Sequence, residues 1–176
     1  MDLSIFNLVL AGVLATMASY TDLKDELIYN KHVFPFLLLG VALAVVQQRY
    51  DLLLSGGIVF AFYFFIYAAK NTLAKLTVML GGIPLPGDEE PIGGGDVKLS
   101  VALALFIGHI PVLAGTVLAS ILLLVIHGVK IWRATGSPVS VLYMATAKLP
   151  SAKPVAFGYL LGPMCVLVAV YQYYFY

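Results

Sequence analysis

The chain has 176 residues, of which 61% are hydrophobic and only 11% are charged. A soluble domain usually carries about 25% charged residues, so this composition excludes an ordinary soluble protein and indicates an integral membrane protein. The formal net charge of +1 gives no sign of the basic face that a nucleic-acid partner requires. The single cysteine, Cys165, excludes an internal disulfide and is expected to be a small packing residue within an apolar run.

Six apolar segments predict six transmembrane helices, at residues 3–20, 33–46, 52–69, 97–110, 112–129 and 155–175. We therefore expect an all-α, polytopic membrane protein with a single six-helix domain over residues 1–176. The first segment lacks the basic residues that precede the apolar core of a signal peptide, so we interpret it as a retained helix.

The division between the fourth and fifth segments depends on Gly108 and Pro111, because proline cannot continue a helix without losing a hydrogen bond. One proline-kinked helix is the alternative. A run of about thirty apolar residues is, however, too long for a single crossing of the bilayer.

The basic residues predict the orientation of the chain. With six spans, nine of the ten Lys and Arg residues fall on one side of the membrane, and only Arg49 falls on the other. The positive-inside rule then places both termini outside the plasma membrane and the first, third and fifth connections in the cytoplasm.

Two aspartates lie at the predicted cytoplasmic boundary. Asp22 ends the first segment, and Asp96 begins the fourth, directly after three glycines at 93–95. An ionised carboxylate at membrane depth costs roughly 2.5 kcal/mol or more, so both residues are functional candidates. The alternative for Asp96 is an N-cap that follows a glycine turn.

Two carboxylates that share one proton supply a base and an acid together. Such a pair can activate water and protonate the leaving amine, which hydrolyses a peptide bond without a metal, a cofactor or a covalent intermediate. The glycines at 93–95 would permit positive φ and let a substrate backbone approach Asp96. The three histidines, His32, His109 and His127, lack the spacing of a zinc site.

A long connection at 71–95 carries further acids. Five acidic residues share the predicted cytoplasmic face, namely Asp25, Glu26, Asp88, Glu89 and Glu90. They either attract a basic substrate over a distance or simply form a solvated cluster without a specific role.

The two aspartate runs resemble those of the G-x-G-D aspartic peptidases of membranes, and among these the prepilin and preflagellin peptidases. Residues 93–99, Gly-Gly-Gly-Asp-Val-Lys-Leu, are similar to that family's G-x-G-D-x-K-L signature. Residues 22–30 are similar to its first-aspartate motif, with Tyr29 where the family often has proline. The resemblance implies that Asp22 and Asp96 are the catalytic pair. We further expect a set of substrate-binding or loop residues, namely Gly93, Gly94, Gly95, Lys98, Asp88, Glu89 and Glu90.

The resemblance also implies a function. The chain is expected to cleave the class III signal peptide, or leader, from prepilins or preflagellins at the cytoplasmic face of the membrane. Those substrates carry a basic leader and hold their apolar segment in the lipid bilayer. Paired Cys-x-x-Cys motifs, which accompany N-methylation in bifunctional members, are absent from the sequence, so we expect a compact, peptidase-only form.

Two alternatives stay open. A presenilin-like intramembrane protease shares G-x-G-D, but its first acid directly follows tyrosine, whereas Thr21 separates Tyr20 from Asp22 here. A small ion-coupled transporter would also place acids in the membrane, with inverted repeats and acids near the midplane.

Overall fold

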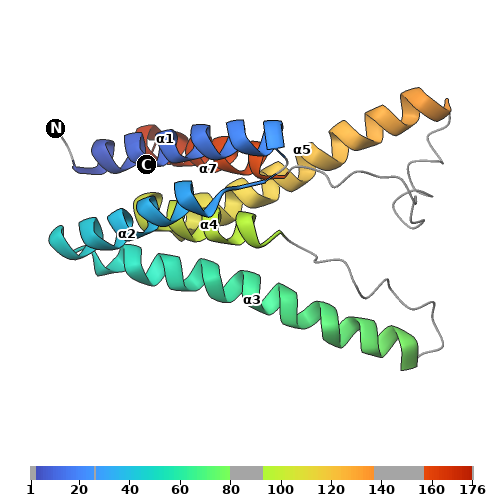
Figure 1. Ribbon diagram of the computed structural model, residues 1–176, viewed down its shortest axis with the longest axis horizontal. Helices are drawn as coiled ribbons and strands as arrows, with labels where there is room; N and C mark the ends of the chain where they lie inside the picture. Colours follow the sequence, from blue (N-terminus) through green and yellow to red (C-terminus); the bar gives the residue numbers. More distant parts are fainter. Residues whose placement is uncertain (1–2, 26, 80–92, 137–156, 176) are drawn as a thin grey trace.

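The computed structural model describes residues 3–25, 27–79, 93–136 and 157–175. Six helices and no strand occur within these ranges, and Figure 1 shows them as α1 (Leu3–Asp25), α2 (Asn30–Val46), α3 (Tyr50–Met79), α4 (Gly94–Ile107), α5 (His109–Thr135) and α7 (Gly158–Phe175). Each predicted apolar segment forms a helix, and the all-α class is confirmed.

Four of these helices, α1, α3, α5 and α7, are long and apolar enough to cross a membrane. Helices α2 and α4 have 17 and 14 residues, fewer than the roughly 20 that a full crossing requires. The described residues therefore form a multi-pass membrane protein by length and composition, and six crossings stay a prediction.

Helix α3 is longer than the sequence predicts. The connection predicted to begin at residue 71 begins only after Met79, because the helix continues through that residue. The lower hydropathy after Ala69 suggested a helix end, but residues 58–79 contain neither glycine nor proline to break the helix. A fall in hydropathy can therefore mark the edge of the apolar segment without marking the end of the helix.

The chain reverses direction at Gly108, which ends α4 and precedes α5. Its φ of +86° is a conformation that residues with side chains rarely adopt. Pro111 is the third residue of α5, in the first turn, where a missing N–H costs no helical hydrogen bond. The predicted break is confirmed, and the alternative of one proline-kinked helix is wrong.

Helix α4 is the centre of the described bundle, because it packs against each of the other five helices. Half of its residues are buried, namely Leu99, Ser100, Ala102, Leu103, Ala104, Leu105 and Phe106. The hydroxyl of Tyr63 lies 2.9 Å from that of Ser100 and 3.0 Å from that of Thr116, which joins α3, α4 and α5. A helix surrounded by protein need not match the thickness of the bilayer, which explains how α4 can be short.

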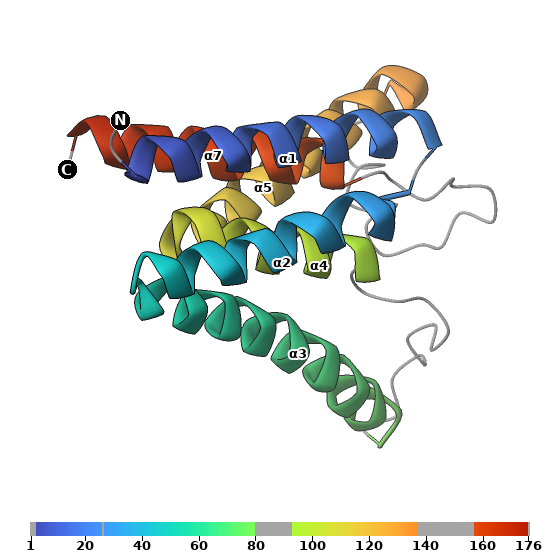
Figure 2. The same ribbon diagram turned by 60° about the vertical axis from the view of Figure 1, so that its left-hand side comes forward.

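Helix α7 lies beside α1 in both views of the bundle (Figures 1 and 2) and also packs against α5. Small residues allow this close approach: a Cβ on Gly115 would lie 2.6 Å from Cα of Cys165, and one on Gly162 would lie 3.0 Å from Cα of Ala15. Cys165 is fully buried, so its predicted packing role is confirmed. The start of α1 and the end of α7 lie at one end of the bundle, and the end of α1 and the starts of α4 and α7 lie at the other (Figure 2).

Candidate active site

Asp22 lies in the last turn of α1 and is buried, with 5% of its surface exposed. The backbone N–H of Tyr159 donates a hydrogen bond of 2.8 Å to its Oδ2 atom. The hydroxyl of Ser19, three residues earlier, donates to the carbonyl of the same Tyr159 at 3.2 Å. The first turn of α7 is therefore attached to α1 at two points, and one of them is the carboxylate.

Asp96 is the third residue of α4 and is partly buried. The N-cap of this helix is Gly93, which makes no side-chain cap hydrogen bond. The alternative interpretation of Asp96 as the N-cap is therefore wrong. Its backbone N–H bonds to the carbonyl of Gly93 at 3.0 Å, as expected for a residue already inside the helix.

The two carboxylates meet at Gly158, the first residue of α7. A Cβ on Gly158 would lie 3.0 Å from Oδ1 of Asp96 and 3.2 Å from Oδ2 of Asp22. The two oxygens are consequently no more than about 6 Å apart, the sum of these distances. Three helix ends that are remote in the sequence thus bring two acids to one point.

The surroundings of Asp96, which lies outside the four candidate spans, favour its neutral form. Burial and the nearby negative charge of Asp22 together raise the pKa of Asp96 from its usual 3.8 to about 7. Burial is the larger cause, because a charge removed from water loses solvation energy. Asp22 instead accepts a backbone hydrogen bond. The two carboxyl groups therefore have different environments, as an acid and a base require.

The glycines at 93–95 act differently from the prediction. Gly93 has φ −60°, and in the described part of the chain positive φ among glycines occurs only at Gly108 and Gly136. None of the three glycines therefore adopts the positive φ that a glycine permits. Close approach is what two of them require: a Cβ on Gly95 would lie 3.0 Å from Cβ of Ile28, and one on Gly93 would lie 3.2 Å from Oδ2 of Asp96. Gly94 faces open space.

Lys98 lies one turn further along α4 than the glycines, and its side chain contacts the start of α2. Its Nζ donates a hydrogen bond of 3.0 Å to Oδ1 of Asn30 and lies 5.9 Å from the centre of the Phe34 ring. The signature run at 93–99 and the first-aspartate run at 22–30 are thus joined by a side-chain hydrogen bond. The expected contact of Lys98 with substrate is not tested by this arrangement.

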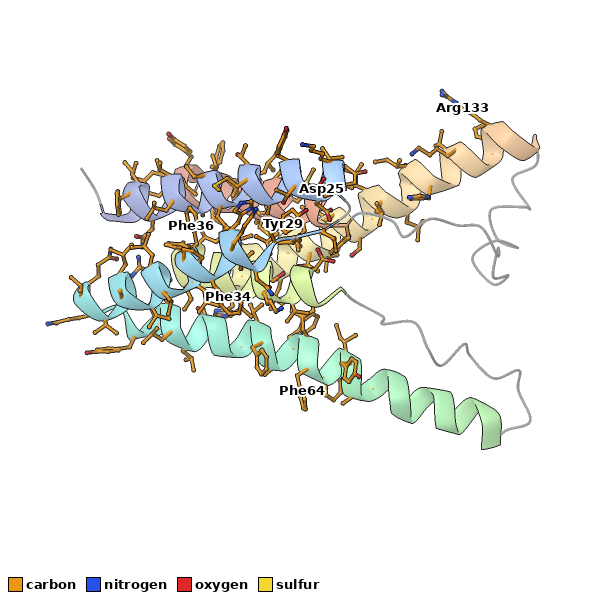
Figure 3. All side chains as sticks on the ribbon, viewed as in Figure 1. Asp25, Tyr29, Phe34, Phe36, Phe64 and Arg133 are labelled. Carbon is orange, nitrogen blue, oxygen red and sulfur yellow. The ribbon has the colours of Figure 1, made fainter. Side chains whose placement is uncertain are left out.

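Of the remaining predicted acids, the structure describes Asp25. Asp25 is exposed at the end of α1, beside Tyr29 (Figure 3), and a hydrogen bond to its carboxylate raises the pKa of the Tyr29 phenol. Glu26 and the acids at 88–90 lie outside the described residues, so their part in recognition stays a prediction. Across the described ranges, no group of three or more His, Cys, Asp and Glu side chains is placed to hold a metal ion.

Sequence reasoning missed two contributors to the site, Gly158 and Ile28. A Cβ on Gly158 would also lie 2.5 Å from Cδ1 of Ile28, so this side chain touches the same point as the two acids. The signal for Gly158 was present: a glycine begins the last apolar helix at the end of the bundle where Asp22 and Asp96 were predicted to lie. Which residue of that helix start faces the acids depends on helix rotation, which hydropathy does not report.

Comparison with known proteins adds the last observation. No curated protein and no solved structure gives a significant match to the chain. The model of the type IV leader peptidase family matches residues 8–129, a range that contains both Asp22 and Asp96 and ends before α7. Because this match covers more than half of the sequence, the chain belongs to the type IV leader peptidase family.

Proposed function

We propose that this chain is a membrane aspartic endopeptidase in which Asp22 and Asp96 are the catalytic pair. The observation that carries the proposal is the position of the two carboxylates on either side of Gly158, within a chain of the leader peptidase family. Their different environments support different roles. Asp22, which accepts the N–H of Tyr159, suits the base that takes a proton from water, and Asp96 suits the acid that donates one.

In the proposed reaction, a water molecule between the carboxylates loses a proton to Asp22 and attacks the carbonyl carbon of the scissile peptide bond. Asp96 donates its proton toward the carbonyl oxygen as the tetrahedral intermediate forms. Collapse of the intermediate breaks the C–N bond. The departing amine takes the proton held by Asp22, and one hydroxyl of the intermediate returns a proton to Asp96 as the carboxyl product forms. The pair then returns to its starting state with one shared proton, without a metal or cofactor.

The proposed substrate is the leader of a prepilin or preflagellin, cleaved at the cytoplasmic face with the apolar segment of the substrate in the bilayer. Membership of the leader peptidase family supports this class of substrate. The predicted excess of Lys and Arg on one side supports the orientation, with both termini outside and the active site in the cytoplasm. Six crossings are proposed with it, from the six apolar segments of the sequence. The start of α1 and the end of α7 lie at the same end of the bundle (Figure 1), as an even number of crossings requires.

The test is cleavage of a basic prepilin leader by purified protein in detergent. Asp22→Asn and Asp96→Asn should each lower kcat by roughly 100-fold or more, because each removes one half of the proton transfer. Asp51→Asn is the matched control, since Asp51 is an exposed acid that pairs with Arg49 away from the site, and it should retain activity. Normal activity in a folded variant of either catalytic aspartate would exclude that residue from the mechanism.

A further inference from the structure

The connection between α1 and α2 reaches the same point as the two acids, through the side chain of Ile28. A Cβ on Gly95 would lie 3.0 Å from Cβ of Ile28 and 3.6 Å from its Cγ1, and a Cβ on Gly158 would lie 2.5 Å from its Cδ1. One isoleucine thus extends from the residue before Asp96 to the glycine that faces both carboxylates. Either glycine could gain a side chain only if Ile28 moved.

The position of Ile28 is fixed from two directions. Its side chain is partly buried and packs against the hydrophobic core of the bundle. Two residues later, Asn30 accepts the hydrogen bond from Lys98 of α4, at 3.0 Å. The short segment 28–30 is therefore attached to α4 at both of its ends: Ile28 makes an apolar contact at Gly95, and Asn30 accepts a hydrogen bond from Lys98.

We propose that Ile28 is a positioning residue for the aspartate pair: its side chain fills the space between Gly95 and Gly158, fixes the separation of the two acids, and keeps water from Asp96. This inference rests on the proposed function of the pair. Ile28 carries no polar side-chain atom, so it takes no part in proton transfer. Its effect is on the geometry and hydration of the groups that do.

Several charged and titratable groups lie on the elements that carry the two acids or pack against them. Asp22 on α1 acts on it through its charge, and Tyr63 on α3 lies near enough for an electrostatic interaction. Lys98 on α4 is bonded to Asn30. At the start of α2, Lys31 lies over the ring of Tyr29 and His32 contacts its edge. On α7, Tyr159 contributes its backbone N–H to Asp22. All of these groups remain in the Ile28 variants, so a shifted pH profile would report a change in the geometry and hydration of Asp96.

The test compares Ile28→Ala, Ile28→Val and Leu27→Ala by the pH dependence of kcat/KM on a leader substrate. Leu27 is the matched control, because it is the neighbouring aliphatic residue and is 60% exposed. Ile28→Ala should move the high-pH decline toward acid by about one pH unit, because water then reaches Asp96 and its charged form becomes easier to form. Ile28→Val retains the branched Cβ and should restore most of the wild-type profile, and Leu27→Ala should keep it.

A lower yield or lower activity of Ile28→Ala with an unchanged pH profile would overturn the inference, since a merely structural residue does not shift that profile. If Ile28→Ala does not fold, Ile28→Val in a Gly158→Ala background decides the question. The valine lacks the Cδ1 atom that lies 2.5 Å from the added Cβ, so it should recover part of the activity lost by Gly158→Ala, and no recovery would refute the contact. If Asp22→Asn or Asp96→Asn remains active, the proposed function itself fails, which is a separate result.

Discussion

The pH dependence of cleavage tests the proposed roles of Asp96 as the proton donor and Asp22 as the base. With a pKa raised to about 7 by burial and by the charge of Asp22, Asp96 should keep its proton up to near-neutral pH, whereas an unperturbed aspartate would hold one in only about one molecule in a thousand at pH 7. A raised pKa favours the neutral acid, so the donor is present below about pH 7 and is lost above it. Activity should therefore decline above neutrality.

The expected size of the decline follows from a single proton. Well above the apparent pKa, kcat/KM should fall roughly tenfold for each pH unit. The apparent pKa of this decline belongs to the pair of carboxyl groups and not to one residue alone.

The assay is the initial rate of leader cleavage at constant ionic strength, with enzyme returned from high pH to neutral buffer as the control for irreversible loss. Constant kcat/KM up to about pH 9 would refute the assignment of Asp96 as the proton donor.

Three further outcomes are expected. Gly158→Ala should lower kcat by roughly 100-fold, because the added Cβ meets both carboxylates and Ile28, while Gly12→Ala, at a glycine with open space around it, should have little effect; equal activities in the two variants would contradict the crowded geometry. Chelators should leave purified enzyme active, since the proposed chemistry uses no metal, and loss of activity that added metal restores would reject it. Replacement of the five acids Asp25, Glu26, Asp88, Glu89 and Glu90 by Asn or Gln should raise KM for a basic leader and weaken its salt dependence with kcat nearly unchanged; an unchanged KM would show that these acids take no part in recognition.

The helices could be predicted because each follows a long apolar run, but their ends could not. Helix α1 continues past Tyr20 to Asp25, and α2 begins at Asn30 rather than at Val33. Polar residues at the edge of a membrane can remain helical while their side chains reach water, so hydropathy underestimates helix length. The reversal at Gly108 was predictable from Pro111 nearby, although the glycine provides the unusual φ and the proline only tolerates the start of α5.

The meeting of Asp22 and Asp96 was predictable because topology alone places the end of the first helix and the start of the fourth at one face. The contribution of α7 was less accessible, since the side of a helix that faces a partner depends on packing. Gly158 and Gly162 lie one turn apart, and both face α1, where they meet Asp22 and Ala15. Spacing of small residues on α7 was the available signal, and its target could be known only once the helices were packed.

The two acids differ because different helix ends surround them. In a pair of carboxylates with identical environments, either one could hold the shared proton. Here the first turn of α7 supplies a backbone donor to Asp22, whereas Asp96 begins a helix that the rest of the bundle surrounds. Glycines at 95 and 158 let the α1–α2 connection and α7 approach closely enough to create this difference. A substitution that enlarges either glycine should therefore disturb the proposed roles of Asp96 as acid and Asp22 as base before it disturbs the fold.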